Sequence, residues 1–329
     1  MTRAAALLAA IALCTPAAEV NVATPPLPNR AAIARERSAS RIVAEHRYRI
    51  VGRVRLALFW FSRDDVGGAR LTWRSDGRGT VLALLAGSDP ARAPRGLNQW
   101  VYVREETHTD DADVFTLRSL NDDGGAPDAP LDAGNGPLFG ASCASMTQQR
   151  VSSAATTVAA RDATYRMFDR VLDRLAASAD WTSRESGRPA GADAGFLSAL
   201  RHVVDLDDGS PLAPARATYV YNSTIYDLTA RRRHPLGRTE IGGRTFDRLN
   251  RADCAVRNRT TGDVTSFSVT YAPGLSLPVQ IFYQPSFWIR IELRLDDRAD
   301  VPADPAGDAA VLERLRAICH AAGPAASDR

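Results

Sequence analysis

The chain has 329 residues, of which 45% are hydrophobic and 24% are charged. This composition indicates a globular protein with enough apolar material for one large domain or two small ones, and it excludes a chain that is disordered throughout. All 41 basic side chains are arginine and none is lysine, which is typical of a GC-rich genome. The formal net charge is only +3, so the charge balance gives no indication of a nucleic acid or another polyanion as a partner.

The N-terminus has the residue order of a secretory signal peptide. Arg3 precedes an apolar run over residues 4–14, and small residues follow. We therefore predict a signal peptide over residues 1–18 and an exported protein, either periplasmic or extracellular. Cys14 keeps a second interpretation open, a lipoprotein tethered through this cysteine, although Leu13 stands where a small residue is normally required. No later stretch has about 18 uninterrupted apolar residues, so this lipid anchor is the only membrane contact that we expect.

Three cysteines remain once such a signal peptide is removed, namely Cys143, Cys254 and Cys319. In an exported protein, three cysteines allow one disulfide and one free thiol. We predict a Cys254–Cys319 bridge, because Cys254 lies on a predicted strand and Cys319 on the apolar face of a predicted helix, whereas Cys143 lies in a stretch typical of a loop. In the alternative, Cys254 and Cys319 are buried as small hydrophobic residues without a bridge.

Alternation of apolar and polar residues begins after an expected flexible linker over residues 19–41. Between residues 48 and 61 most apolar residues share one parity and the arginines share the other, which is the pattern of a half-exposed strand. Turn sequences rich in Asp and Gly separate further strands, so we expect about five early strands in residues 42–120. Residues 121–145 are rich in Asp, Gly, Ala and Pro, which predicts a mobile surface loop.

The second half of the chain begins and ends with helical patterns. Apolar residues at helical spacing predict a helical connector over residues 163–204, which we expect to lie across the sheet. Late strands follow over residues 217–296, and a C-terminal helix over residues 309–321. Pro278 and Pro285 indicate that the strand near them lies at an edge or contains a bulge, where a missing backbone donor is tolerated.

Together these elements predict a single β-rich domain over residues 42–321. Its fold class is mainly β (α+β), a strongly curved antiparallel sheet or half-barrel of about 10–12 strands with a central helical connector and a C-terminal helix. Whether the early and late strands form one sheet or two stays open at this point.

Several strand motifs resemble those of the DUF3108-like exported proteins, a family of unknown function whose fold is similar to the curved antiparallel sheet of lipoprotein carriers. The resemblance rests on the hairpin at residues 61–71, the strand at 225–232, and the strands at 265–269 and 277–281, the last with a Leu-Pro-Val step. It implies an exported protein with a curved sheet. It transfers no catalytic residue, because the family offers none.

No motif for catalysis, metal binding or cofactor binding stands out. The sequence lacks a Gly-x-Ser-x-Gly elbow, a phosphate-binding glycine-rich loop and a His-Glu-x-x-His motif, and its five histidines lie on separate predicted elements. We therefore expect no catalytic residue, no metal and no cofactor. Among the carboxylates, Glu105 is the best single candidate for acid or base chemistry because it shares parity with Val101 and Val103, although an exposed rim position is favoured.

Aromatic residues on strands are the best candidates for a ligand site. Most strand aromatics belong to a core, but aromatics on a curved sheet also line an apolar pocket where one exists. The six candidates are Trp60, Trp73, Trp100, Tyr102, Phe282 and Trp288. A basic run at Arg231, Arg232 and Arg233 is a candidate for binding an anion or a lipid headgroup, and a hairpin tip enriched in arginine by base composition explains the same run.

These features favour an exported, non-enzymatic protein that binds a lipid or another apolar molecule in the concave face of its sheet. The alternative is a structural or protein-interaction component of the cell envelope, whose concave face is filled by its own side chains. A hydrolase is the third hypothesis, and it requires a nucleophile such as Ser266 or Cys143 beside a histidine.

Overall fold

The protein is mainly β, with sixteen strands and three helices in the part of the chain that the structure describes. The structure is a computed structural model that describes residues 41–56, 59–75, 79–119, 138–159, 163–178, 180–205, 214–232, 235–286 and 289–323. Fourteen strands form one antiparallel sheet, and the remaining two form a small hairpin. The predicted signal peptide, Cys14 and all of the predicted linker except Arg41 lie outside the described residues.

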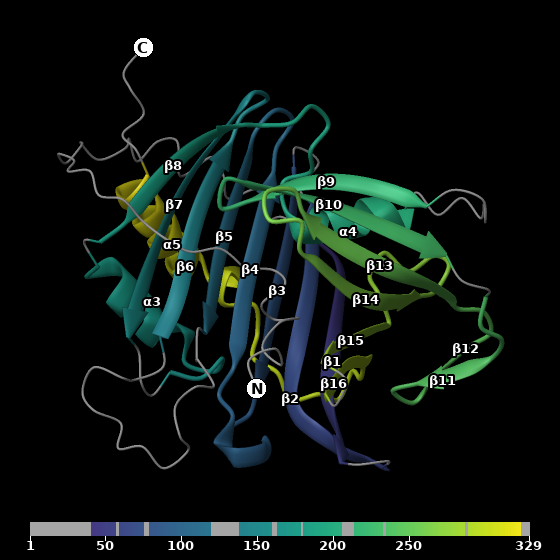
Figure 1. The fold of residues 1–329 in the computed structure, drawn as a ribbon. Helices are drawn as coiled ribbons and strands as arrows, with labels where there is room; N and C mark the ends of the chain where they lie inside the picture. Colours follow the sequence, from purple (N-terminus) through teal and green to yellow (C-terminus); the bar gives the residue numbers. More distant parts are fainter. Residues whose placement is uncertain are drawn as a thin grey trace.

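The large sheet consists of an early half and a late half (Figure 1). The early half contains β1 (Arg41–Leu56), β2 (Phe59–Ser75), β3 (Thr80–Ser88), β4 (Trp100–Thr107), β5 (Ala112–Ser119), β6 (Leu138–Met146), β7 (Arg150–Ala159) and β8 (Thr182–Gly187). The late half contains β9 (Ala215–Tyr221), β10 (Thr224–Arg232), β13 (Asn250–Asn258), β14 (Val264–Tyr271), β15 (Gln280–Ser286) and β16 (Ile289–Leu295), while β11 (Thr239–Ile241) and β12 (Arg244–Phe246) form the hairpin.

One pair of strands joins the two halves into a single sheet. β1 pairs antiparallel with β16, with Tyr48 opposite Leu295 and Val54 opposite Ile289. The strand order then runs β8-β7-β6-β5-β4-β3-β2-β1 and continues β16-β15-β14-β13-β10-β9. The sheet is not closed into a barrel, because β8 and β9 are its two edges.

The late half folds over one face of the early half, and the space between them is the inner core. Figure 1 shows β9, β10, β13 and β14 crossing the direction of the early strands. Side chains from both halves meet there, for example Leu82 and Val103 from early strands and Leu228 and Phe267 from late ones. Helix α4 (Phe196–Asp205) adds Leu200 and its apolar neighbours to this core.

The opposite face of the early half carries the outer core. Helices α3 (Phe168–Ala176) and α5 (Ala309–Ala322) cover it, and both turn apolar side chains such as Leu172 and Ile318 toward the sheet. In β3, Leu82 and Leu84 contribute to the inner core while Leu85 contributes to the outer core. A strand covered on both faces therefore reads as a continuous apolar run, because successive side chains point to opposite faces.

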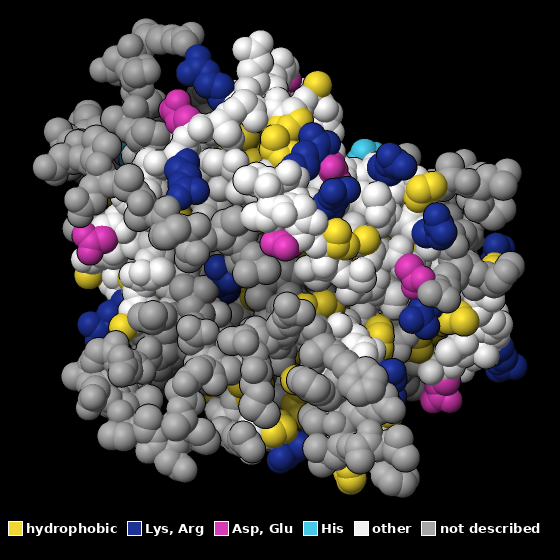
Figure 2. All heavy atoms as spheres, viewed as in Figure 1, with side chains coloured by type: hydrophobic (Ala, Val, Ile, Leu, Met, Phe, Trp, Pro, Cys, Tyr) yellow, Lys and Arg dark blue, Asp and Glu magenta, His cyan; other side chains and the backbone are white. Residues whose placement is uncertain are grey.

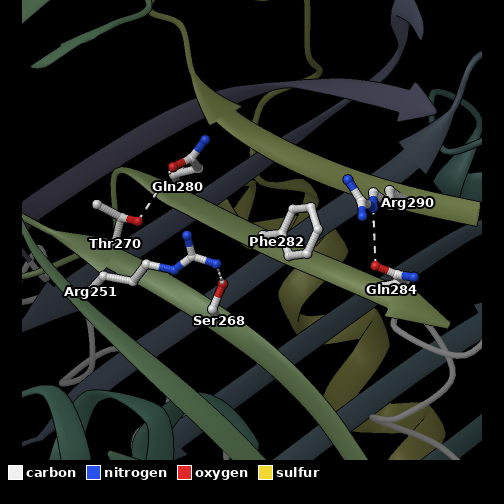
Figure 3. Close-up of a pocket in the computed structure, with 7 residues that line it drawn as sticks. All are labelled: Arg251, Ser268, Thr270, Gln280, Phe282, Gln284 and Arg290. Atoms are coloured by element: carbon white, nitrogen blue, oxygen red, sulfur yellow. Dashed lines mark hydrogen bonds between the residues drawn. The ribbon is translucent and has the colours of Figure 1, made fainter. Parts of the chain in front are cut away.

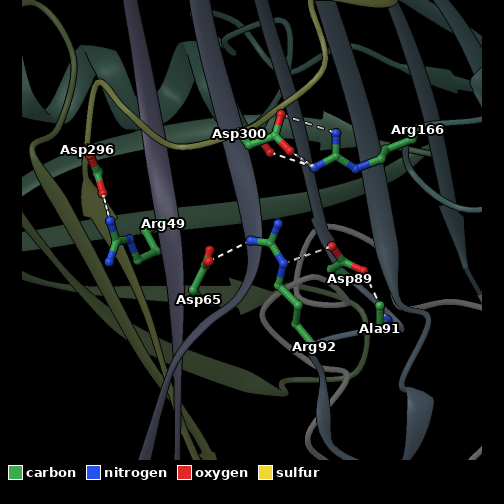
Figure 4. Close-up of polar contacts among 8 residues, drawn as sticks. All are labelled: Arg49, Asp65, Asp89, Ala91, Arg92, Arg166, Asp296 and Asp300. Carbon is green, nitrogen blue, oxygen red and sulfur yellow. Dashed lines mark hydrogen bonds and ion pairs between the residues drawn. The ribbon is translucent and has the colours of Figure 1, made fainter.

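Residues 297–308 carry the chain from the late half to the outer core. Arg70 Nη2 donates to the carbonyl oxygen of Val301 (3.1 Å), and Tyr102 donates to Asp304 Oδ1 (2.9 Å). Gly68 permits this close crossing, since a Cβ at that position would lie 2.5 Å from Val301 Cγ1. Ion pairs hold the beginning of this path, between Arg49 and Asp296 and between Arg166 and Asp300 (Figure 4).

The predicted disulfide pairing is wrong. Cys319 on α5 is bonded to Cys143 on β6, and Cys254 is a buried free thiol. The reason is the face on which each cysteine lies: Cys143 and Cys319 belong to the outer core, whereas Cys254 points into the inner core. The bridge therefore ties the C-terminal helix to the early half.

Three other predictions require correction. β6 starts at Leu138, so the predicted loop over 121–145 is shorter than expected at its C-terminal end. The helical connector over 163–204 is interrupted by β8, and its two helices lie on opposite faces of the sheet. The sheet has fourteen strands, whereas about 10–12 were predicted. Strands β6, β7 and β8 are rich in small and polar residues and lack a clear alternation signal, so the sequence did not predict them.

The prolines predicted either a sheet edge or a bulge, and the bulge is confirmed at Pro285. The register between β15 and β16 shifts between Tyr283 and Ser286, which places a bulge at Pro285. The edge interpretation is wrong, because β15 pairs with β14 on one side and β16 on the other. None of the helices in the described part of the chain is long and apolar enough to cross a membrane.

Candidate functional site

The concave side of the sheet is packed with side chains. Tyr219 and Tyr226 stack with ring centroids 5.3 Å apart, and Phe196 of α4 lies 5.7 Å from Phe267 by the same measure. These rings belong to the inner core, together with aliphatic residues of both halves. The expected apolar pocket on the concave face is thus occupied by the protein's own side chains in this region.

A depression lies instead on the outer face of the late half, and we call it the outer groove. It has a volume of about 380 Å³ and crosses β13, β14, β15 and β16 (Figure 3). It is lined by Arg251, Ser268, Thr270, Gln280, Phe282, Gln284 and Arg290. These residues share a face because each strand of the late half turns its alternate, apolar positions toward the inner core.

Hydrogen bonds fix the polar part of the outer groove. Arg251 Nη2 donates to Ser268 Oγ (3.1 Å), and Thr270 Oγ1 donates to Gln280 Oε1 (3.3 Å). Gln280 Nε2 in turn donates to Glu292 Oε1 (2.6 Å), just beyond the groove. Ser268 and Thr270 are buried, so they form the floor of the depression.

Aromatic rings hold Arg290 at the other end of the groove. Its guanidinium carbon lies 3.9 Å from the ring centroid of Trp60 and 5.9 Å from that of Phe282. Its Nε also donates to Gln284 Oε1 (3.0 Å). Cation–π contacts of this kind favour a fixed guanidinium orientation, so Arg290 is positioned before any ligand arrives.

A second depression, the end cleft, lies between residues 107–112, residues 188–194 and helix α4, with a volume of about 780 Å³. Its polar groups bind one another. His202 Nδ1 lies 3.0 Å from Asp193 Oδ2, and Gln148 donates to Asp110 Oδ1 (2.6 Å). Arg201, which also lines the cleft, lies 3.3 Å from Asp205, although its Nε has no hydrogen bond within the described residues. Because these charged groups are paired with one another, the end cleft is the weaker candidate for ligand binding.

Glu105 lies beneath the end cleft and is not at an exposed rim, so the favoured expectation for this residue is wrong. Its side chain anchors the start of α4. Oε1 accepts from the N–H of Leu197 (2.7 Å), and Oε2 accepts from the N–H (2.8 Å) and the hydroxyl (2.6 Å) of Ser198. Burial raises the pKa of Glu105 to about 7, while the three hydrogen bonds oppose that rise. The carboxylate satisfies orphan helix donors, a structural role.

The predicted aromatic site residues do not share one pocket. Trp100 and Tyr102 are buried in the outer core. Trp73 packs against the inner core, with the Arg201 guanidinium carbon 3.6 Å from its ring centroid. Trp60 and Phe282 come together around Arg290. Trp288 lies outside the described residues.

Only one of the three arginines in the predicted basic run has a described side chain. Arg231 is exposed on β10, opposite Asp253 of β13. The side chain of Arg232 and the whole of Arg233 lie outside the described residues. Anion binding by this run stays a prediction.

The candidate nucleophiles of the hydrolase hypothesis gain no support. Cys143 is held in the disulfide, and Ser266 is exposed without a hydrogen bond to any histidine of the described chain. Within the described ranges, no group of three or more His, Cys, Asp or Glu residues is arranged to hold a metal ion.

Sequence reasoning did not select the polar residues of the outer groove. The available signal was the period-two pattern of the late strands. Gln280, Phe282 and Gln284 alternate with buried residues on β15, and Arg290 and Glu292 alternate with apolar residues on β16. That pattern identifies an uncovered face. It does not identify which strands lie side by side.

Comparison with known proteins gives no assignment. No protein-family model matches the chain, and neither a curated protein nor a solved structure shows significant similarity to it. The resemblance to the DUF3108-like proteins therefore stays a prediction.

Proposed function

We propose that this is an exported, non-enzymatic protein that binds a lipid or another largely apolar molecule, and that the outer groove receives the polar end of that ligand. The observation that carries the proposal is the position of Phe282, a partly exposed ring between two guanidinium groups in a depression of the sheet face. An aromatic ring offers apolar contact area, and the arginine stems extend it.

The size of the groove supports binding of one end of the ligand. Sites that enclose a drug-sized molecule have volumes of roughly 300–1,000 Å³. The outer groove, at about 380 Å³, is at the low end of that range. The Cys143–Cys319 disulfide also supports export, because structural disulfides persist mainly in oxidising compartments.

Native mass spectrometry of the purified protein tests the proposal. We expect the wild type to carry a co-purified amphiphile and Phe282→Ala to lose it. Phe61→Ala is the matched control, since Phe61 is 57% exposed and does not line the groove. A wild type without bound ligand, or equal loss from both variants, would contradict the proposal.

A second candidate, an interaction component of the cell envelope, is favoured by the filled inner core. In that case the outer groove meets a protein. A photo-crosslinking amino acid at Gln284, an exposed lining residue, distinguishes the two candidates. Capture of a defined envelope protein in place of a small molecule would favour the second.

A further inference from the structure

The arginines next to the outer groove differ from those inside it in their partners, while Arg231 and Arg257, exposed on the same face outside the groove, form no ion pair within the described residues. Those beside the groove are paired with carboxylates: Arg294 Nη2 lies 2.8 Å and Arg53 Nη2 3.4 Å from Glu292, and Arg49 pairs with Asp296. Arg251 and Arg290, inside the groove, have no carboxylate within 4.0 Å among the described residues. The positive charge of the groove is therefore not neutralised where it lines the depression.

Hydrogen-bond donors of these two arginines also remain available. The Nη2 of Arg251 donates to Ser268 and its Nη1 has no acceptor among the described residues, whereas its Nε is buried and also lacks a partner there. Arg290 uses its Nε for Gln284 and stacks its guanidinium group on Trp60, and its two terminal nitrogens have no acceptor among the described residues. An unpaired donor in a partly desolvated site costs free energy, and an acceptor from a ligand removes that cost.

Ser268 adds a third donor. Its Oγ accepts from Arg251, and no described residue accepts its own hydroxyl proton. Thr270, by contrast, uses its hydroxyl proton within the protein, and Gln280 uses one of its two amide N–H groups there. The groove thus presents two guanidinium groups and one hydroxyl, all able to donate, around the ring of Phe282 (Figure 3).

We infer that the polar end of the ligand is an oxyanion, such as a phosphate, sulfate or carboxylate, and that Arg251, Arg290 and Ser268 bind it. This inference rests on the proposed function of the groove. A guanidinium group matches the geometry of two oxyanion oxygens, and a charge-assisted hydrogen bond is roughly twice as strong as a neutral one. A cationic or zwitterionic end would meet uncompensated positive charge.

The wider surface agrees with an anionic ligand. Most charged side chains visible over β9, β10, β13 and β14 are basic (Figure 2). Arg231 also lies on the outer face, opposite Asp253 on the strand that carries Arg251. A positive field around a site accelerates the arrival of an anion and is screened by salt.

A chain-matched series of amphiphiles tests the inference. Dodecyl phosphate, dodecyl maltoside and dodecyltrimethylammonium are titrated below their micelle concentrations, with binding measured by calorimetry and by tryptophan fluorescence. We expect the phosphate to bind at least about tenfold more tightly than the neutral maltoside, since one charge-assisted contact corresponds to about that factor. Arg251→Gln and Arg290→Gln should each weaken only the phosphate, by about tenfold, whereas Arg257→Gln, an exposed control on β13 outside the groove, should not.

The outcomes separate the two proposals. If no amphiphile binds, both the proposed function and the oxyanion inference fail. If all three bind equally and the glutamine variants change nothing, the inference alone fails. Inorganic phosphate serves as a competitor. Competition at concentrations near those of dodecyl phosphate would identify a free phosphate ester as the source of the oxyanion, and competition only at far higher concentrations would identify a lipid headgroup.

Discussion

The outer face of this sheet has two regions, one covered by helices and one that contains the outer groove. In the early half it carries apolar residues such as Leu85, Tyr102 and Leu117, and helices α3 and α5 bury it. In the late half the same face carries Arg251, Gln280 and their neighbours, and it contains the outer groove. One continuous face thus serves as core where alternate positions are apolar and as a candidate binding surface where they are polar.

The largest expected effect concerns the covered region, because the disulfide fastens α5 to it. Cys143 and Cys319 are 176 residues apart. Loss of a bridge that closes so long a loop costs about 5 kcal/mol in the chain-entropy model. Cys319→Ala should lower the denaturant midpoint strongly. Cys254→Ala should not change how far dithiothreitol lowers that midpoint, because Cys254 is not in the bridge. A Cys319→Ala variant as stable as the wild type would show that the bridge is dispensable.

Next in size is a cavity beneath a covering helix. Leu172 of α3 is fully buried in the outer core. Leu172→Ala should reduce the free energy of unfolding by about 2–5 kcal/mol, through lost burial and the cavity left behind. Urea denaturation followed by circular dichroism measures this change. A cost below about 1 kcal/mol would mean that α3 covers the sheet only loosely.

Glu105 should give the early half a pH-dependent stability. Its folded pKa of about 7 is above the ordinary value of 4.5 because of burial. Its contribution to the free energy of unfolding is therefore fully present below pH 4.5 and is lost as the pH rises through 7, a change of about 3.5 kcal/mol at about 1.4 kcal/mol per pKa unit. Stability curves between pH 4 and 8 should differ in slope between the wild type and Glu105→Gln. Parallel curves would contradict this prediction.

Glu105 packs closely against Gly195, and a side chain at Gly195 should therefore have a smaller effect on stability. A Cβ on Gly195 would lie 2.5 Å from Glu105 Oε1, whereas one on Gly187 would meet nothing within 4 Å. Gly195→Ala should cost about 1–3 kcal/mol, because the anchor of α4 must shift, and Gly187→Ala should be nearly neutral. Thermal unfolding of both variants measures the difference, and equal melting temperatures would contradict the prediction.

The smallest effect is expected in the open region. Arg290 is partly exposed and pairs with no carboxylate among the described residues, so Arg290→Gln should lower the free energy of unfolding by only about 0.5–1 kcal/mol, the value of an exposed cation–π contact. The same variant should weaken binding of an anionic ligand, as argued above. A large loss of stability would mean that the groove is a structural part of the sheet, and the contrast between the two regions would then disappear.

The late strands illustrate how far local patterns lead. Most of their bounds agree with the alternation in residues 217–296, and the bulge at Pro285 follows from the missing backbone donor of proline. The early strands β6 to β8 escaped prediction, since a sequence such as Ala154-Ala155-Thr156-Thr157 has little contrast between its two faces. Period-two alternation is a signal only where one face is buried and the other is not.

By itself, the sequence determined a mainly β domain with a C-terminal helix, because alternation and helical spacing are local properties of the chain. Only the tertiary structure decided which strands are neighbours, which cysteine meets Cys319, and where each aromatic lies. Trp60 and Trp100 look alike in the sequence, yet the Trp60 ring stacks against the guanidinium group of Arg290, whereas Trp100 is buried in the outer core. The physical reason is that strand order and the path of residues 297–308 depend on contacts between residues far apart in the chain.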